Sequence, residues 1–221
     1  MKVICNKNTI EIKVSNQNID YFDALKFMKS RVNNIISNEE NELIWFLNHD
    51  SIYTKGTSSK DNEIVKKVDI PVIETNRGGK ITYHGPGQRI VYFLINLNKR
   101  KKDIRGFVNL IQKSAINFLK DINIDSKTDS KRIGIWVTKV GKVNLKKEKK
   151  IGAIGLRLKK WTTYHGFSFN INPNLDYYNN ILPCGLKDYD STSLEDLGIN
   201  VSQELFDKIY LKNILKELQH F

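Results

Sequence analysis

Runs of apolar side chains predict a sheet of several strands. Residues 9–14 alternate apolar and polar side chains, as a half-buried strand does, whereas residues 43–47 and 90–97 are almost continuously apolar. A continuous apolar strand is expected where both faces of a sheet are covered. Further strands are predicted at residues 70–74, 133–137, 151–157 and 162–171.

Helices are predicted where apolar side chains recur every three or four residues. Asp20 can cap a helix that runs to about Ser37, and Ser202 can cap one over residues 203–219, because a short oxygen-bearing side chain accepts hydrogen bonds from the first helical amides. The clearest periodicity covers residues 104–120. The positions expected to face the core include Phe22, Leu25, Val32, Phe107, Leu110, Phe118, Leu205, Phe206 and Ile214.

The polar segments between these elements are predicted as loops. Residues 49–56 leave strand 43–47 as a loop, and residues 57–69 form a polar loop with a short helical turn. A second short turn is predicted at residues 193–198. The pattern indicates a single α/β domain over residues 1–221, in which helices flank a mixed β-sheet.

The charge balance adds an expected partner to this picture. The 221 residues carry 36 Lys and Arg against 24 Asp and Glu, a formal net charge of +12. Nucleic acid, a membrane surface or an acidic protein would be attracted to such a chain, although a solvated lysine surface explains the excess equally well. No apolar run approaches the roughly 20 residues of a membrane-spanning helix, and the N-terminus lacks the apolar core of a signal peptide. We expect a cytoplasmic protein.

Cysteine and histidine usage argues against a disulfide framework and against a metal centre. The chain has two cysteines and four scattered histidines: Cys5, Cys184, His49, His84, His165 and His220. Their spacing does not match a zinc pattern. We expect neither a metal nor a bound cofactor, and the remaining question is whether one cysteine is a nucleophile.

A glycine-rich stretch lies between the apolar runs 70–74 and 90–97. It reads Arg77-Gly78-Gly79-Lys80-Ile81-Thr82-Tyr83-His84-Gly85-Pro86-Gly87-Gln88. Glycine lets a ligand approach the main chain closely, so the stretch is a candidate binding loop. A hairpin loop that happens to be rich in glycine explains it equally well.

Cys184 is the sharpest candidate for a reactive side chain. Its flanking proline and glycine form a turn that would display a thiol rather than bury it. Because cysteine attacks as the thiolate, it needs a nearby cation or base, and Lys150 at the start of strand 151–157 could supply one. The alternatives are that Cys184 is a small buried hydrophobe, as we expect of Cys5, and that Lys150 is solvated like the lysines around it.

Three motifs follow one another along the chain. They are the stretch 77–88; Lys150-Ile151-Gly152-Ala153-Ile154-Gly155-Leu156-Arg157 with Tyr164-His165-Gly166; and Pro183-Cys184-Gly185 with Thr192-Ser193-Leu194. In order and chemistry they resemble the lipoyl(octanoyl) transferase family, the octanoyl-carrier-protein:protein transferases of lipoate biosynthesis, over roughly residues 43–198. The resemblance implies a fold of the biotin/lipoate protein ligase type, which agrees with the mixed sheet.

The resemblance also implies roles for individual residues. Cys184 matches the nucleophile that takes the octanoyl group as a thioester, and Lys150 matches the lysine that activates it and moves protons. The residues that match the acyl pocket are Arg77, Gly78, Gly79, Lys80, Ile81, Thr82, Tyr83, His84, Ala153, Ile154, Gly155, Gly166, Phe167 and Ser168. The segment 138–149 is longer and more basic than the family usually shows, which leaves Lys149 in competition with Lys150. His84 and His165 are interpreted as pocket walls rather than acid–base groups.

The implied chemistry is physically consistent with these residue types. Glycine and alanine on facing strands would leave room for an eight-carbon chain, and burying it contributes about 0.8 kcal/mol per methylene. Backbone amides of the glycine turns or the Thr82 hydroxyl could stabilise the oxyanion.

The resemblance implies acidic protein partners. The donor would be octanoyl-acyl carrier protein, and the acceptors would be the lipoyl domains of 2-oxoacid dehydrogenases and the glycine cleavage H protein. Because complementary charge raises encounter rates, the basic segments 99–102 and 139–149 are candidate docking sites. We expect a monomer that binds neither nucleic acid nor a membrane.

Two rival functions remain open from the sequence. An ATP-dependent lipoate or biotin ligase of the same fold would form an acyl-adenylate and would need no cysteine nucleophile, so the turn around Cys184 argues against it. A nucleic-acid-binding module would need basic residues interleaved with exposed aromatic residues on one face, whereas the aromatic residues here fall mainly on apolar faces.

Overall fold

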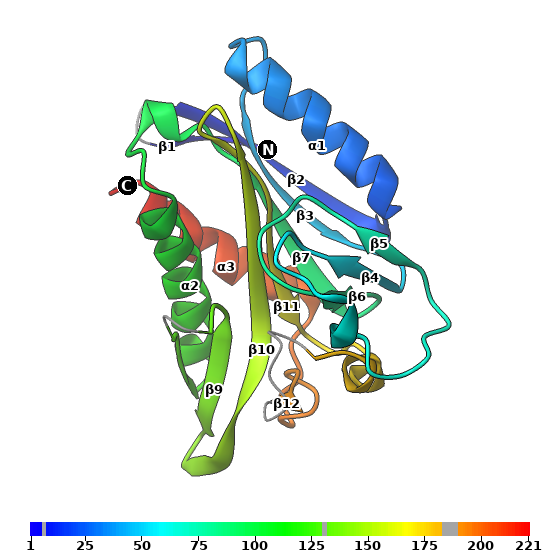
Figure 1. Cartoon of the computed structure of the whole chain (residues 1–221). Coiled ribbons are helices and arrows are strands. Elements are labelled where there is room, and N and C mark those ends of the chain that lie inside the picture. The colour runs from blue at the N-terminus through cyan, green and yellow to red at the C-terminus, as the bar shows by residue number, and fades with distance from the viewer. Residues whose placement is uncertain (6–7, 130–131, 183–189) are drawn as a thin grey trace.

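The computed structural model describes residues 1–5, 8–129, 132–182 and 190–221 and contains a large and a small sheet (Figure 1). The large sheet has the strand order β1-β2-β3-β7-β11-β10-β9-β8, and β12 also pairs with β10. Its strands are β1 Lys2–Cys5, β2 Asn8–Asn18, β3 Glu42–Asn48, β7 Gln88–Leu94, β8 Ile124–Lys127, β9 Ile135–Val140, β10 Val143–Lys159, β11 Thr162–Asn170 and β12 Asp190–Ser191. The β2–β3 and β10–β12 pairs are parallel and the others antiparallel, so the predicted mixed sheet is confirmed.

Helices cover both faces of this sheet. They are α1 Tyr21–Ile36, α2 Ile104–Asp121 and α3 Gln203–Leu218, with short 3-10 helices η1 Asp61–Glu63, η2 Leu97–Lys99 and η3 Leu175–Asn180. Figure 1 shows α2 and α3 on one face, and α1 with the small sheet on the other. Alternate residues of β3 and β7 are therefore buried on opposite sides, which explains why both strands are continuously apolar. Among the described helices, none is long and apolar enough to span a membrane.

The predicted helix caps are confirmed. The Asp20 carboxylate accepts hydrogen bonds from the amides of Phe22 and Asp23, and Ser202 caps α3 in the same way. The predicted inward orientation of Phe22 and Leu205 is wrong, since these side chains are 57% and 44% exposed. In α1 the buried stripe begins at Tyr21, and the neighbouring residue of a helix points about 100° away from it.

The small sheet corrects two predicted loops. Its strands are β5 Val72–Glu74, β4 Ile52–Lys55 and β6 Thr82–His84, in the order β5-β4-β6. Only β5 was expected as a strand. β4 and β6 are too short to show a hydrophobic pattern, and they are stabilised by a separate core of Tyr53, Ile81, Tyr83 and Ile181. This core places residues 77–84 over the face of the large sheet that carries α1.

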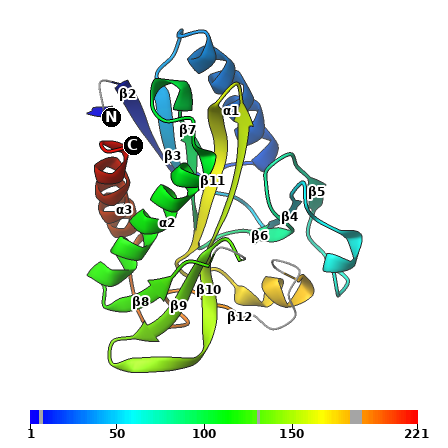
Figure 2. The same cartoon turned by 60° about the vertical axis from the view of Figure 1, so that its left-hand side comes forward.

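The basic segment 139–149, which we call the basic arm, is a β-hairpin rather than a loop. A two-residue turn at Gly141–Lys142 joins β9 to β10, and Gly141 has φ +54°, a conformation that favours glycine. β10 is longer than the predicted strand 151–157 because it includes the solvent-exposed half of this hairpin. In Figure 2 the hairpin projects from the lower end of the sheet.

Segment 99–102, the second candidate docking site, lies at the opposite end of β10. The adjoining η2 contacts the turn between β10 and β11, where the Leu97 amide donates to the Trp161 carbonyl at 2.8 Å. Within the segment, the Arg100 side chain is buried and donates to the Glu42 carboxylate at 2.6 Å. Arg100 is therefore not available to a partner, whereas Lys99, Lys101 and Lys102 are exposed, so segment 99–102 stays a candidate docking site beside the basic arm.

Candidate active site

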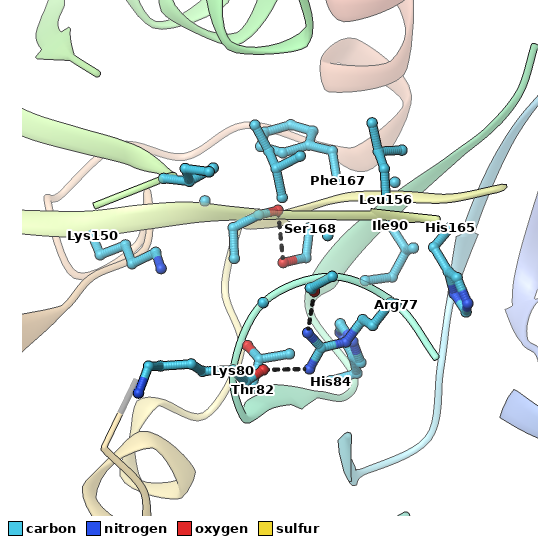
Figure 3. A pocket seen from close by; sticks show the side chains of 18 of the residues that line it. Arg77, Lys80, Thr82, His84, Ile90, Lys150, Leu156, His165, Phe167 and Ser168 are labelled. Atoms are coloured by element: carbon cyan, nitrogen blue, oxygen red, sulfur yellow. Dashed lines mark hydrogen bonds between the residues drawn. The ribbon is translucent and has the colours of Figure 1, made fainter. Parts of the chain in front are cut away.

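A cavity of about 400 Å³ lies between the loop 77–82 and the strands β7, β10 and β11. Its volume is within the usual range of about 300–1,000 Å³ for small-molecule sites. Figure 3 shows Lys150 at one end of the cavity and His165 at the other, with Arg77, Thr82 and His84 facing the strands. We call residues 77–82 the roof and the strands the floor.

The structure brings the predicted pocket residues together, with one exception. The lining contains Arg77, Gly78, Gly79, Lys80, Ile81, Thr82, His84, Lys150, Ala153, Ile154, Gly155, Gly166, Phe167 and Ser168. Tyr83 does not line the cavity. Side chains of β6 alternate between two faces, so Tyr83 points away from its neighbours and stacks on Tyr177 with ring centroids 4.6 Å apart.

The cavity extends around the edge of β10 toward α2. Ile104 and Val108 of α2 line this part. Figure 3 shows Leu156 and Phe167 on the opposite side of the strands from Ser168. Ile154 and Phe167 were predicted as acyl-pocket walls, and they contact this outer part while packing against the main core. The inner part beneath the roof is therefore the better candidate for an acyl chain.

Arg77 fixes the roof to the small sheet. Its guanidinium donates to the Thr54 carbonyl at 2.5 Å, the Thr54 hydroxyl at 2.9 Å and the Lys80 carbonyl at 2.8 Å, all through Nη2, and to the Gly78 carbonyl at 3.0 Å through Nη1. Burial lowers its pKa from the ordinary value. Since so many donors already have protein acceptors, Arg77 holds the roof in shape more than it offers a free charge to a ligand.

The glycines of the floor permit close backbone contacts, which corrects the expectation that they leave room for an acyl chain. A Cβ at Gly155 would lie 2.7 Å from the Gly78 carbonyl oxygen, and the Gly78 amide donates to the Leu156 carbonyl at 2.9 Å. A Cβ at Gly166 would lie 2.0 Å from the carbonyl oxygen of Val91 on β7. Any side chain at either position would separate these backbones. The space of the cavity comes instead from small floor residues such as Ala153 and Ser168.

Lys150 reaches the cavity because of an irregularity in β10. Side chains of a regular strand alternate between two faces, yet Ile151 and Ile154 pack on the same core side although they are three residues apart. The β9–β10 register shifts between Lys150 and Gly152, as at a β-bulge. Lys150 therefore shares a face with Ser168, as Figure 3 shows.

The side chain of Lys150 lies against Gly134 and Trp136. Its Nζ is 5.6 Å from the centroid of the Trp136 ring, within the range of cation–π contacts. Gly134 has φ +152°, and a Cβ there would lie 2.7 Å from Lys150 Cε. The backbone is also held, since the Lys150 carbonyl accepts from the Thr192 amide at 2.8 Å. Because glycine has no side chain, residue 134 leaves room for the Lys150 side chain.

Lys149 points away from the cavity. Its Nζ donates to the Asp196 carboxylate at 3.1 Å, and it is absent from the cavity lining. Of the two competing lysines, Lys150 is the one that lines the cavity. The predicted nucleophile Cys184 lies in 183–189, outside the described residues. The segment that follows it returns to the site, because Ser191 lines the cavity and pairs with Lys150. Cys5 is buried in the core, as expected.

Burial keeps the histidines near the cavity uncharged at neutral pH. Burial, with the nearby charges of His49 and Arg77, lowers the pKa of His84 to about 3. Burial and Arg77 likewise lower the pKa of His165 to about 3, and burial lowers that of His49 to about 4. These values support the interpretation of His84 and His165 as walls. The described residues contain no group of His, Cys, Asp and Glu that could hold a metal ion.

A buried hydrogen-bond network connects His84 to the segment beside Lys150. Gln88 Nε2 donates to the Asn170 side-chain oxygen at 2.9 Å and to the Tyr178 hydroxyl at 2.8 Å, so Gln88 Oε1 is the acceptor for His84 Nδ1 at 2.7 Å. Asn170 Nδ2 then donates to the Thr192 carbonyl at 2.9 Å. The network fixes the imidazole tautomer and holds the cavity wall against the strand that carries Lys150.

Several lining residues were missed from the sequence: Tyr21, Ile90, Tyr92, Arg132, Asn170 and Tyr178. Ile90 and Tyr92 could have been predicted as a pair from the strand expected at residues 90–97, because side chains two residues apart share a strand face. Tyr21 and Tyr178 could not have been predicted. Tyr21 begins α1 and Tyr178 lies in η3, and only tertiary packing brings these two elements to the cavity.

Comparison with known proteins assigns the family. The sequence matches the Lipoyl protein ligase A/B catalytic domain over residues 20–215. The octanoyltransferase of Wolbachia pipientis subsp. Culex pipiens (strain wPip) is 47% identical over 190 residues, which cover 86% of this chain and 90% of that protein. The octanoyltransferase of Bartonella henselae is 39% identical over 221 residues, which cover 98% of this chain and 90% of that protein.

Solved structures confirm the expected fold. The lipoate protein ligase of a bipartite archaeal lipoylation system from Thermoplasma acidophilum superposes with a TM-score of 0.65 at 15% identity, covering 95% of this chain and 84% of that one. At this identity the likeness concerns the fold alone. The family match over residues 20–215 and the sequence relatives show that the chain belongs to the lipoyl protein ligase A/B catalytic domain family and, within it, to the octanoyltransferases.

Proposed function

We propose that this protein transfers an octanoyl group from octanoyl-acyl carrier protein to a lysine amine of lipoyl domains, through a thioester on Cys184. The observation that carries the proposal is the position of Lys150, which the bulge in β10 directs into an apolar cavity of acyl-chain size. The octanoyltransferase relatives supply the reaction class. The acceptors would be the lipoyl domains of 2-oxoacid dehydrogenases and the glycine cleavage H protein.

The reaction has two acyl-transfer steps. The Cys184 thiolate first attacks the donor thioester carbonyl, the carbonyl–sulfur bond to the carrier breaks, and the Lys150 ammonium gives a proton to the departing thiolate. The acceptor amine then attacks the enzyme thioester, an amide forms, and the Cys184 thiolate is released. Lys150, neutral after the first step, accepts the proton of the attacking amine. Since the donor thioester is already activated, the reaction needs no ATP.

The cavity would hold the acyl chain during both steps. Ser168 and Ile90 of the floor face the roof residue Thr82 across the inner part (Figure 3). Ala153, which pairs with Ser168 on the neighbouring strand, also lines the cavity. Burying the chain stabilises the complex by about 0.8 kcal/mol per methylene. The uncharged imidazoles of His84 and His165 make the far end compatible with an apolar chain terminus.

Intact-mass measurement tests the thioester. We expect that wild-type protein mixed with octanoyl-acyl carrier protein gains one octanoyl group that hydroxylamine removes, and that Cys184→Ser gains none. Transfer to a lipoyl domain should proceed equally with and without ATP. Full transfer activity with an unmodified Cys184 would contradict the mechanism, and an absolute requirement for ATP would indicate the ligase alternative.

Paired lysine substitutions test the assignment of the base. We expect Lys150→Ala to lose activity by about a hundredfold or more, because a positioned acid–base group contributes about that much. Lys149→Ala should stay within about threefold, because its side chain points to Asp196 and an exposed ion pair contributes little. Equal losses in single-turnover assays would mean that Lys150 is not the catalytic lysine.

The basic arm is the proposed docking site for the acidic carrier protein. Among the described residues, Lys142, Lys146 and Lys147 of the arm take part in no ion pair, and the same strand continues into Lys150. We further propose that the protein acts as a monomer in the cytoplasm. Light scattering at assay concentration tests the oligomeric state.

A further inference from the structure

Glu63 carries a carboxylate that is buried beside the cavity roof. It ends η1 and is 2% exposed. Its Oε1 accepts from Lys80 Nζ at 2.6 Å, and its Oε2 accepts from the Ile81 amide at 3.3 Å. Both donors belong to residues that line the cavity. Removing the carboxylate would leave a roof ammonium and a buried roof amide without this acceptor, which is costly in a desolvated site.

The main chain around Glu63 holds the segment that leads to Cys184. The Glu63 carbonyl accepts from the Leu182 amide at 2.7 Å, and the Val65 amide donates to the Asn180 carbonyl at 2.9 Å. Between them, Ile64 and Ile181 form an antiparallel bridge. Leu182 is two residues before Cys184. One short stretch of chain therefore holds the roof through a side chain and the approach to the nucleophile through the backbone.

The roof has other contacts near its Lys80–Ile81 end, because Ile81 shares the small core with Ile181 and the Thr82 side chain interacts with the Tyr178 hydroxyl. Glu63 differs from these in being the described acceptor for the Lys80 ammonium. The bond from the Gly78 amide to the Leu156 carbonyl fixes the opposite end to β10. Arg77 reaches the Lys80 carbonyl but attaches it to Thr54 of the small sheet. The Glu63 carboxylate is thus the described group that sets the position of the Lys80 side chain relative to the segment before Cys184.

We propose that Glu63 is a positioning residue, which holds the roof over the acyl chain in fixed relation to residues 180–182, the described segment that precedes Cys184. The inference rests on the proposed function in so far as the chain beneath the roof is an octanoyl group. In this role Glu63 determines how well the cavity fits the acyl chain, rather than contributing mainly to the stability of the fold. Loss of its carboxylate should therefore change how the cavity discriminates between acyl chains of different length.

Asp61 provides a matched control in the same 3-10 helix. It also forms an ion pair with a lysine, Lys55, at 2.7 Å, but its side chain is 98% exposed and it does not line the cavity. Asp61→Asn removes the same charge as Glu63→Gln removes, two residues away. A general effect of charge on this helix would appear in both variants, and a positioning effect only in Glu63→Gln.

Binding of octanoic and hexanoic acids, followed by calorimetry, tests the proposal. We expect Glu63→Gln to weaken the binding of octanoic acid by about tenfold and to reduce the preference for octanoic over hexanoic acid. The affinity of Asp61→Asn for octanoic acid should stay within about twofold of wild type. A Glu63→Gln protein with wild-type affinity and preference overturns the inference. Binding of the free acids needs no thioester chemistry, so this test is independent of the acylation of Cys184. Failure of Cys184 to become acylated would contradict the proposed function but would leave the inference about Glu63 to be decided by the binding measurements.

A double variant decides the question should Glu63→Gln fail to fold. Glu63→Gln combined with Lys80→Met removes both charges of the ion pair, so no buried charge is left unpaired and the fold should tolerate the change. We expect the double variant to show the same loss of chain-length preference, because the two residues act as one contact. An unchanged preference in the double variant overturns the proposal.

Discussion

At the scale of single residues, the position of the Lys150 ammonium depends on the absence of a side chain at residue 134. The aliphatic part of the lysine occupies the place where a Cβ would project, and Trp136 lies beneath the charge. Catalytic groups must be held within a fraction of an ångström, and a displacement of about 1 Å can lower a rate a hundredfold. Gly134 therefore belongs to the proposed active site, because it makes room for Lys150, although it carries no reactive side chain.

Gly134→Ala should lower octanoyl transfer by about a hundredfold, because the new methyl group displaces Lys150. Gly141→Ala is the control, since Gly141 also has positive φ but a Cβ there meets nothing within 4 Å. Single-turnover rates measured well below each melting temperature separate displacement from unfolding. A Gly134→Ala enzyme as active as Gly141→Ala would show that the lysine tolerates the shift.

At the scale of elements, the sequence predicted those parts whose signal is local. The apolar runs of β3 and β7 and the caps of α1 and α3 follow from neighbouring residues, and so do the motifs that line the cavity. β4 and β6 could not be predicted, because four and three residues show no pattern and tertiary pairing decides their state. The bulge beside Lys150 is equally invisible, since it is a property of register against β9. Tyr83 was misplaced because β6 was taken for a loop.

The positive charge of the basic arm should matter for encounter with the acyl carrier donor. Reversing Lys142, Lys146 and Lys147 to Glu should lower kcat/KM for the acyl carrier donor by about tenfold or more at low salt, because attractive charge accelerates encounter by 10-fold or more. The effect should shrink as salt rises. Lys101→Glu with Lys102→Glu is the matched comparison in segment 99–102, at the other end of β10. An octanoyl thioester of a small neutral thiol should react equally with all variants. Equal defects with both donors would place the arm in catalysis rather than docking.

At the scale of the whole molecule, three buried imidazoles lie where the two sheets meet. His49 Nδ1 donates to the Ile19 carbonyl at 2.6 Å and its Nε2 accepts from the Tyr92 hydroxyl at 2.7 Å, so the neutral form is fully bonded. Its ring centroid is 6.1 Å from that of His84. A charge on either imidazole would be buried near another, and near the Arg77 guanidinium, which lowers the pKa of His84 and of His165.

As the pH is lowered, the free energy of unfolding should therefore begin to fall at a higher pH than protonation of carboxylates alone would cause. Burial holds these pKa values at about 3 to 4, below the ordinary value of about 6.5, so the unfolded chain binds protons that the folded chain does not. Stability should be complete above about pH 6.5 and decline below it, by up to about 2 kcal/mol per imidazole at pH 5.

Urea titrations at several pH values measure this decline. His49→Gln should remove about a third of the slope between pH 6.5 and 5, since one of three comparably buried imidazoles is lost. His220→Gln, on an exposed side chain near the C-terminus, should leave the slope unchanged. A free energy of unfolding that is constant between pH 7 and 5 would contradict the neutral burial of the cluster.

The two-residue turn at the tip of the basic arm separates the length of the arm from the geometry of the cavity. Val140 pairs with Val143 next to that turn, whereas Lys150 is held by partners on the other side of the register shift. Matched residues could be added to or removed from both strands at the tip without turning Lys150 to another face, because a strand repeats every two residues. The reach toward a partner can thus vary among related chains, or be redesigned, while the chemistry stays in place.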